Sequence, residues 1–185
     1  MPRAFALLPV VAVAALLSAC ATMPPAAPGP AAADAPFVAE GRLSAKRGAD
    51  AVAGNFVWTH ADARDTIVLD SPLGQTLARL SGSEGRARIE LADGAVAEAP
   101  DWEALTLRTL SVPLPVAGLA WWIRGRAHPR SAHGVELDAF GRPVVLRQDG
   151  WEAVYAYSDD AARLPSRVRL AWPDVDVRIV IDRWP

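Results

Sequence analysis

The chain has 185 residues, 51% of them hydrophobic, and its 19 Lys and Arg residues nearly balance 21 Asp and Glu residues, giving a formal net charge of −2. This balance argues against nucleic acid as a partner, because nucleic acid selects strongly basic surfaces. The single cysteine, Cys20, excludes an intrachain disulfide.

The N-terminus has the pattern of a secretion signal. Arg3 precedes an apolar stretch, residues 4–17, that is too short to span a bilayer comfortably, and small residues lead up to Cys20. This ending is similar to the cleavage site of bacterial lipoprotein signal peptides, which implies removal of residues 1–19 and acylation of Cys20. Ala21, and not Asp, follows the cysteine. By similarity to enterobacterial sorting signals, this implies the periplasmic side of the outer membrane. The alternative is an ordinary secretory signal with an incidental cysteine.

Residues 20–36 are rich in Pro, Ala and Gly and contain almost no large apolar side chains. Such a segment cannot form a core and is typical of an extended, semi-rigid tether. The remaining residues, 37–185, are of a size suited to one domain.

Short runs of alternating apolar and polar residues fill most of that domain and predict β-strands. In the first clear run, Phe56, Trp58 and His60 alternate with polar or smaller residues, and near the end Val175 begins another. Repeated short strands favour an antiparallel sheet that curls into a barrel or a sandwich. The expected strands lie in residues 55–61, 64–71, 75–82, 86–91, 135–140, 143–148, 151–157, 166–172 and 175–184.

Residues 99–125 interrupt the strand pattern with two predicted helices. Asp101 can cap the first helix, and the second can begin at Pro115 with Leu119, Trp122 and Ile123 on one face. Two short apolar helices among strands can plug or cover one mouth of a curled sheet, or simply pack on it as core. The sequence leaves both interpretations open.

The residues that could carry catalysis or metal binding form no recognisable pattern. The three histidines, His60, His128 and His133, lack the spacing of a metal site, and neither a GxSxG elbow nor a phosphate-binding glycine loop is present. Most carboxylates alternate with arginines, as on solvated strand faces. We therefore expect no enzyme activity, no metal and no cofactor.

Aromatic residues are the more informative feature. The chain has seven tryptophans, and Trp58, Trp122, Trp151, Trp172 and Trp184 all fall in predicted elements. They are either a tryptophan-rich core or the wall of a partly vacant barrel, since small barrels commonly hold one apolar ligand. Sequence pattern does not separate the two.

The connection between two predicted strands contains a rigid turn. Ser71, Pro72, Leu73 and Gly74 fit a type I turn, which places Leu73 at the corner, where side chains usually meet water. This leucine either folds back onto its own hairpin or makes an exposed apolar contact.

Several segments resemble the LolB family of outer-membrane lipoprotein receptors. They are GNFVW, LDSPLGQTLARL, LPVAGLAWWIRG, QDGWEAVY and RIVIDRW, and they occur in the family's order across nearly the whole domain. The resemblance implies a mainly β fold with a few short helices: a half-open antiparallel β-barrel, monomeric, with a helical lid over an apolar cavity. It further implies acceptance of lipoproteins from the periplasmic carrier LolA and release of their acyl chains into outer-membrane lipid, without a cofactor.

The resemblance also assigns roles to residues. The turn of Pro72, Leu73 and Gly74 matches the family's membrane-insertion loop. The family's recurrent tryptophans match four positions here, and apolar neighbours complete the predicted wall of the acyl cavity. The predicted wall residues are Phe56, Trp58, Leu69, Leu77, Trp122, Trp151, Tyr155 and Trp184.

The sequence departs from the family pattern at its start, where the tether runs almost directly into the first strand and an amphipathic N-terminal helix appears short or missing. Arg124, Arg126 and Arg130 could face an acidic carrier surface, although an ordinary solvated turn is the favoured interpretation. The alternative function is an assembly lipoprotein of the envelope that binds a protein partner and carries no lipid. In that case, Leu73 would anchor an interface and the tryptophans would be plain core.

Overall fold

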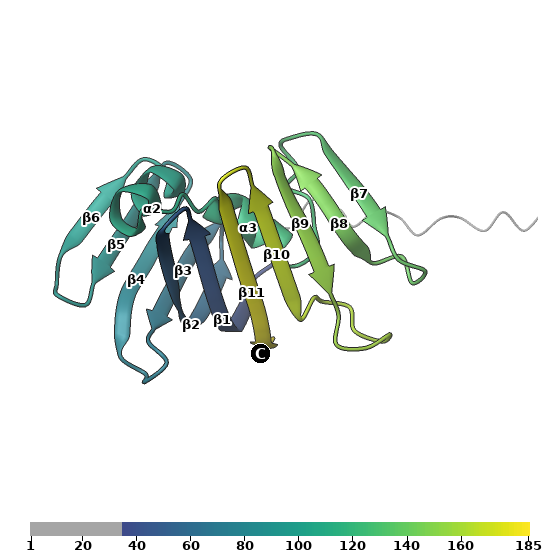
Figure 1. The fold of residues 1–185 in the computed structure, drawn as a ribbon, viewed down its shortest axis with the longest axis horizontal. Helices are drawn as coiled ribbons and strands as arrows, with labels where there is room; N and C mark the ends of the chain where they lie inside the picture. Colours follow the sequence, from purple (N-terminus) through teal and green to yellow (C-terminus); the bar gives the residue numbers. More distant parts are fainter. Residues whose placement is uncertain (1–34) are drawn as a thin grey trace, which may run out of the picture.

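A computed structural model describes residues 35–185. The predicted signal peptide, Cys20 and most of the tether lie outside these residues. Eleven strands and two helices follow one another along the described chain (Figure 1). They are β1 (Phe37–Arg47), β2 (Asp50–Ala61), β3 (Arg64–Asp70), β4 (Thr76–Ser83), β5 (Arg86–Leu91), β6 (Val96–Ala99), α2 (Trp102–Leu110), α3 (Val116–Trp122), β7 (His133–Leu137), β8 (Pro143–Gln148), β9 (Trp151–Ala156), β10 (Arg167–Trp172) and β11 (Val175–Arg183).

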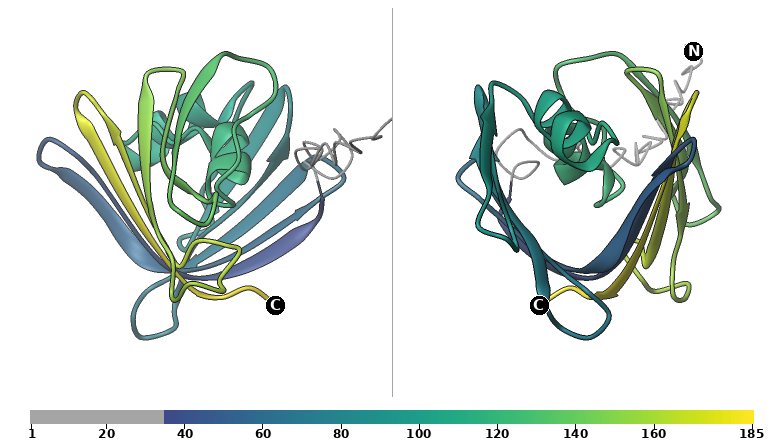
Figure 2. Two further views of the ribbon diagram at one scale, coloured as in Figure 1. Left: turned by 90° about the vertical axis from the view of Figure 1, so that its right-hand side faces the viewer. Right: turned by 60° about the vertical axis from the view of Figure 1, so that its left-hand side comes forward.

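All strands belong to one antiparallel sheet, in the order β6-β5-β4-β3-β2-β1-β11-β10-β9-β8-β7. The first strand pairs with the last, Leu43 opposite Ile179, so both ends of the domain meet at the centre of the sheet. The sheet curls strongly, while its outermost strands, β6 and β7, pair with only one neighbour each within the described chain (Figure 2). The result is the expected half-open barrel with helices at its mouth.

Alternation along the strands decides which side chains face the concave side. In β11, Val175, Val177, Ile179 and Ile181 are buried, and the residues between them are more exposed. The predicted strands are confirmed, with small shifts at their ends; Trp184, for example, lies one residue beyond β11. The short strand β6 was not expected, because its alanines and its length of four residues give little pattern.

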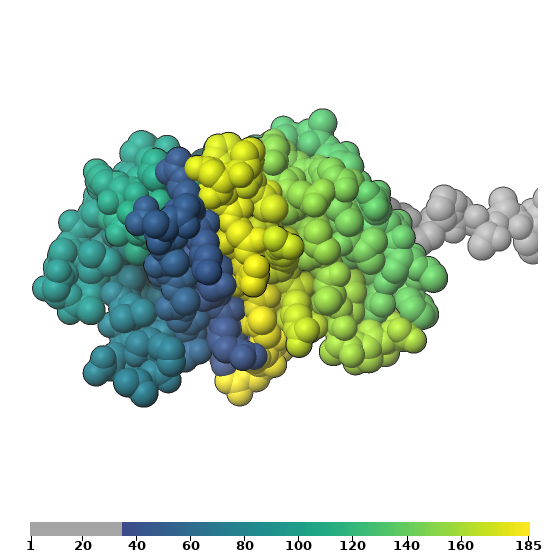
Figure 3. Space-filling model, viewed as in Figure 1, coloured from purple at the N-terminus to yellow at the C-terminus, as the bar shows by residue number. Residues whose placement is uncertain are grey.

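The convex side carries alternating charges on neighbouring strands. Arg42 on β1 donates to Asp182 on β11 at 2.8 Å, and Arg183 pairs with Glu40. Figure 3 shows this face, with β1 and β11 side by side across its middle. These pairs place charged side chains in water and leave the concave face apolar.

Both predicted helices are present. The Asp101 side chain accepts a hydrogen bond from the Ala104 backbone N–H at 2.7 Å, which caps α2, and Pro115 directly precedes α3. Buried Thr106 joins the helices, because its hydroxyl donates to the Trp102 carbonyl and accepts from the Leu114 N–H, each at 2.8 Å. Both helices lie at the wide end of the curled sheet (Figure 2).

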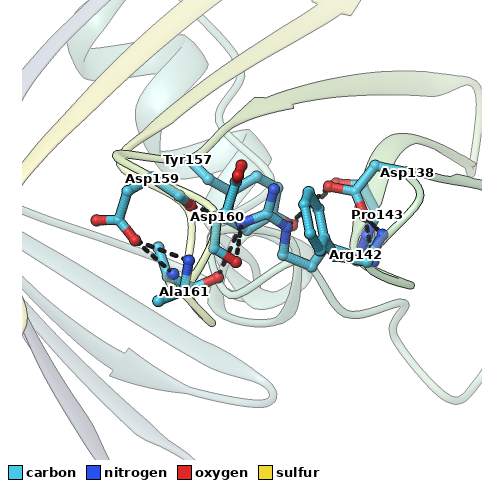
Figure 4. Close-up of polar contacts among 9 residues, drawn as sticks. Asp138, Arg142, Pro143, Tyr157, Asp159, Asp160 and Ala161 are labelled. Carbon is cyan, nitrogen blue, oxygen red and sulfur yellow. Dashed lines mark hydrogen bonds and ion pairs between the residues drawn. The ribbon is translucent and has the colours of Figure 1, made fainter.

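A cluster around Arg142 holds two loops together (Figure 4). Its guanidinium donates to Asp138 at 2.8 Å and to the Asp159 carbonyl at 2.7 Å, and lies 4.2 Å from the centre of the Tyr157 ring. The Tyr157 hydroxyl donates to the Pro143 carbonyl at 2.9 Å. The cluster fixes the β7–β8 turn to the connection between β9 and β10.

Candidate functional site: the concave face and its mouth

The concave face collects most of the predicted wall of the acyl cavity. Six of the eight predicted side chains are buried, namely Phe56, Trp58, Leu69, Trp122, Trp151 and Tyr155. Five of them lie on β2, β3 and β9, at alternating positions, and Trp122 reaches the same interior from α3. Trp184 is half-buried and donates to the Pro165 carbonyl at 3.1 Å.

Leu77 differs from the other predicted wall residues because its side chain is 39% exposed. The register between β3 and β4 shifts here: Leu69 pairs with Ala78, but Asp70 pairs with Thr76. Leu77 is therefore the extra residue of a β-bulge, and its direction does not follow simple alternation. The structure leaves it at the edge of the buried wall.

The turn of Ser71 to Gly74, predicted to be a membrane-insertion loop, has the expected hydrogen bond. The Gly74 N–H donates to the Ser71 carbonyl at 2.9 Å, and the Ser71 N–H donates to the Gln75 carbonyl at 2.7 Å. Gly74 has a φ of +80°, which glycine adopts without strain. The Leu73 side chain is 90% exposed and does not fold back onto its hairpin. This loop hangs from the narrow end of the barrel, away from the helices (Figure 2).

A cavity of about 390 Å³ lies at the wide end, between the helices, the ends of strands β2 to β4 and the β4–β5 turn. His60, Trp102, Trp121 and Glu103 are among its lining residues. Partial burial raises the pKa of the Glu103 carboxyl, and the neighbouring Asp101 carboxylate adds to the rise. The mouth of the barrel thus mixes aromatic surface with a few polar groups.

A buried polar cluster supports the strand side of this cavity. Trp58 Nε1 donates to Asp65 Oδ1 at 2.7 Å, and His60 Nδ1 lies 2.8 Å from the same oxygen. Asp65 and His60 are only about 5% exposed. Asp65 was not predicted as a site residue, although it alternates with Ile67 and Leu69 and so shares their face. Its carboxylate accepts hydrogen bonds from two buried rings.

Gln148, at the end of β8, attaches α3 and the following loop to the sheet. Its side-chain oxygen accepts from Trp122 Nε1 and from the His128 N–H, both at 2.8 Å. Its amide nitrogen donates to the His128 carbonyl at 2.7 Å and to the Ser131 hydroxyl at 2.8 Å. Gln148 is 3% exposed. No local pattern identified this residue, because its partners lie 17 to 26 positions away in the chain.

Of the arginines in the α3–β7 loop, Arg130 is exposed, as in the solvated turn favoured by the sequence, whereas Arg124 is buried. Arg124 is 8% exposed; it donates to the Ala120 and Ala35 carbonyls and lies 4.9 Å from the Phe37 ring centre. Arg130 instead reaches across the mouth to Glu84, in the β4–β5 turn, with contacts of 2.5 and 2.8 Å. Arg124 and Arg130 therefore hold the loop in place, for which their spacing in the sequence gave no signal.

Residues 35–185 contain neither a metal-binding cluster nor a membrane-spanning helix. No group of three or more His, Cys, Asp or Glu side chains lies close enough together to hold a metal ion. In this part of the chain, no helix is long and apolar enough to cross a membrane.

Comparison with known proteins matches the same residues. The family model described as outer membrane lipoprotein LolB matches residues 35–184. The outer-membrane lipoprotein LolB of Azoarcus sp. (strain BH72) is 40% identical over 174 residues, which cover 92% of this chain and 90% of that protein. The LolB proteins of Thiobacillus denitrificans (34%; 95% of each chain) and Pseudomonas aeruginosa (strain LESB58; 36%; 78% of this chain and 72% of that one) are also similar. The curled sheet, the two helices at its mouth and these matches together show that the chain belongs to the outer-membrane lipoprotein LolB family.

Proposed function

We propose that this protein is a receptor that receives lipoproteins from the periplasmic carrier LolA and delivers them to the inner leaflet of the outer membrane. Acylated Cys20 anchors it there, and residues 20–36 separate the domain, residues 37–185, from the lipid surface. The protein acts by binding and release and has no enzymatic activity. The observation that carries this proposal is the apolar, aromatic concave face beneath two helices at an open end of the sheet.

The concave face provides the surface for acyl chains. Phe56, Trp58 and Tyr155 are large buried side chains of this face, and α2 and α3 lie at the wide end of the sheet (Figure 2). For an acyl chain to enter the barrel, α2 and α3 must move away from the sheet. Each tenfold preference of the receptor over the carrier requires about 1.4 kcal/mol of tighter binding. The bilayer buries whole acyl chains and is the final acceptor.

The turn of Pro72, Leu73 and Gly74 makes the membrane contact. Transfer of one leucine from water into apolar surroundings is worth about 2 kcal/mol. This is too little to anchor the domain but enough to orient a domain that Cys20 already holds at the membrane. Exposure of Leu73 at the tip of a hydrogen-bonded turn supports this role.

A transfer assay tests the receptor function. The lipid-free chain from Ala21 onward is mixed with LolA that carries a labelled lipoprotein, without nucleotide. We expect the label to move to this chain. Leu73→Glu should still accept the label but fail to pass it to liposomes, and Leu73→Met serves as the matched apolar control. If the wild-type chain takes no label, the receptor function is wrong and the assembly-lipoprotein alternative becomes the one to pursue.

A further inference from the structure

A second cavity at the barrel mouth, on the far side of α3 from the first, has a different composition. Its volume is about 420 Å³, and we call it the tryptophan groove. Its main walls are Trp122, Trp151, Trp172, Pro113 and Pro115. The Trp151 and Trp172 rings stack with their centres 5.9 Å apart and their planes at 14°, and Trp122 tilts against Trp151 at 6.2 Å.

Trp172 is the unusual member of this group. It shares the concave face with Leu170, which is fully buried, yet at the last position of β10 its own side chain is 40% exposed. The ring packs against Gly150, where φ is +79° and a Cβ would lie 3.0 Å from Trp172 Nε1. The absence of a side chain at Gly150 thus leaves space for the Trp172 ring, which is only partly buried.

The polar edges of the two stacked rings are also available. Trp122 donates its indole N–H to Gln148, whereas the indole N–H groups of Trp151 and Trp172 have no hydrogen-bond partner among residues 35–185. The exposed side of the Trp172 ring, two proline rings and two indole N–H donors match an extended proline-rich peptide, whose rings stack on aromatic side chains and whose carbonyls accept hydrogen bonds. A flexible acyl chain would leave both donors unsatisfied.

We propose that the tryptophan groove binds the proline-rich segment that follows the acylated cysteine of a client lipoprotein. This inference rests on the proposed receptor function. Once acyl chains enter the barrel, the adjoining peptide must leave through the mouth, which is where the groove lies. Binding there would hold the peptide in a defined direction while the acyl chains occupy the interior.

The chain itself supplies one such client segment. Residues 21–36 contain five prolines, at positions 24, 25, 28, 30 and 36. As a member of an outer-membrane lipoprotein family, a newly made second copy of this chain needs the same delivery. In a polyproline II conformation, seven residues span about 22 Å, at roughly 3.1 Å per residue. The segment from position 24 to 30 carries four of the five prolines. The occupant to which we commit is this segment of a second copy.

The test uses a synthetic peptide of residues 21–36, titrated into the lipid-free chain, residues 20–185 with Cys20→Ala. We expect saturable binding that shifts the indole N–H resonances of Trp151 and Trp172. Trp172→Ala should weaken binding by about tenfold or more, as is typical of a central aromatic contact. The matched control is Phe140→Ala, which removes another exposed aromatic side chain, in the turn at the opposite end of β8, and should leave binding unchanged.

Three results would overturn the proposal. The first is that the peptide does not shift the indole resonances of Trp151 and Trp172. The second is that a peptide with all five prolines replaced by alanine binds equally well. The third is that the peptide binds only after the prolines of the chain's own tether are changed to alanine. The last result would identify the chain's own tether as the occupant.

Uptake of a fluorescent fatty acid is measured in parallel, and Trp172→Ala should not change it. If wild-type uptake is normal while the peptide fails to bind, only the groove proposal is wrong; if neither ligand binds, the receptor function fails as well.

Discussion

Two tyrosines near the end of β9 differ in one hydrogen bond. The Tyr155 hydroxyl is buried and has no partner among the described residues, while the Tyr157 hydroxyl donates to the Pro143 carbonyl. Burial raises the pKa of Tyr155 far above its ordinary value, which keeps the hydroxyl neutral. An unsatisfied buried polar group costs about 1–3 kcal/mol. We therefore expect Tyr155→Phe to stabilise the fold by about 1 kcal/mol, seen in urea unfolding as a higher midpoint with an unchanged slope.

Tyr157→Phe is the matched control for that substitution. It removes the same atom but loses a hydrogen bond, so the free energy of unfolding should fall by about 1 kcal/mol. A lower midpoint for Tyr155→Phe would show that its hydroxyl has a partner in solution. Tyr155 also lies in the predicted acyl wall, so tighter fatty-acid binding by Tyr155→Phe would place the ring against the ligand.

At the scale of elements, α3 depends on one side chain of a distant strand. Removal of the Gln148 amide takes away the hydrogen bond of Trp122 Nε1 and two hydrogen bonds to the backbone of His128. We expect Gln148→Leu to speed amide hydrogen exchange in residues 116–131 by about tenfold or more, since each lost buried bond costs about 1–3 kcal/mol. Ser131→Ala removes only one contact of the same amide and should have a smaller effect. Equal exchange rates in both variants and the wild type would show that packing, not Gln148, holds α3.

The sequence pattern within one segment predicts its secondary structure and its buried face, but not the strand with which it pairs. Alternation in residues such as Phe56 and Trp58 predicted the strands and their buried faces, and the Asp101 cap and Pro115 predicted both helices. The pairing of β1 with β11 was not predictable, because it joins residues more than 100 positions apart and neither strand carries a signal for the other. In the site, alternation located the aromatic wall, but the bulge at Leu77 and the contacts of Asp65 depend on how neighbouring strands pair. The contacts of Gln148 join elements 17 to 26 positions apart in the chain.

The whole molecule has two ends with different properties. The wide end carries the helices, the 390 Å³ cavity and the tryptophan groove, whereas the narrow end carries the Leu73 turn and the C-terminus (Figures 1 and 2). If Leu73 touches the membrane, the helical mouth faces away from it, toward an arriving carrier. Orientation of the domain is therefore the role of Leu73 that this geometry favours.

Closure of the wide end involves one ion pair that crosses it. Glu84 lies in the β4–β5 turn and Arg130 in the loop after α3, and both side chains are at least two-thirds exposed. Such a pair adds little to global stability and is weakened by salt. We expect Glu84→Gln to leave the unfolding midpoint nearly unchanged but to speed fatty-acid uptake at low salt. Uptake by the wild type should accelerate as salt rises, while uptake by the variant should not respond.

The ion pair of Glu84 and Arg130 also predicts how the rate of fatty-acid uptake changes with pH. Its hydrogen bonds and charge allow Arg130 to lower the pKa of the Glu84 carboxyl, so the pair persists at neutral pH and is lost only when acid protonates Glu84. Uptake should therefore stay constant near neutrality and accelerate below about pH 4.3, the ordinary value for glutamate. Stopped-flow fluorescence measures both dependences. The exchanged pair, Glu84→Arg with Arg130→Glu, should restore slow uptake at low salt. If the exchanged pair instead behaves like Glu84→Gln, the contact across the mouth does not control entry.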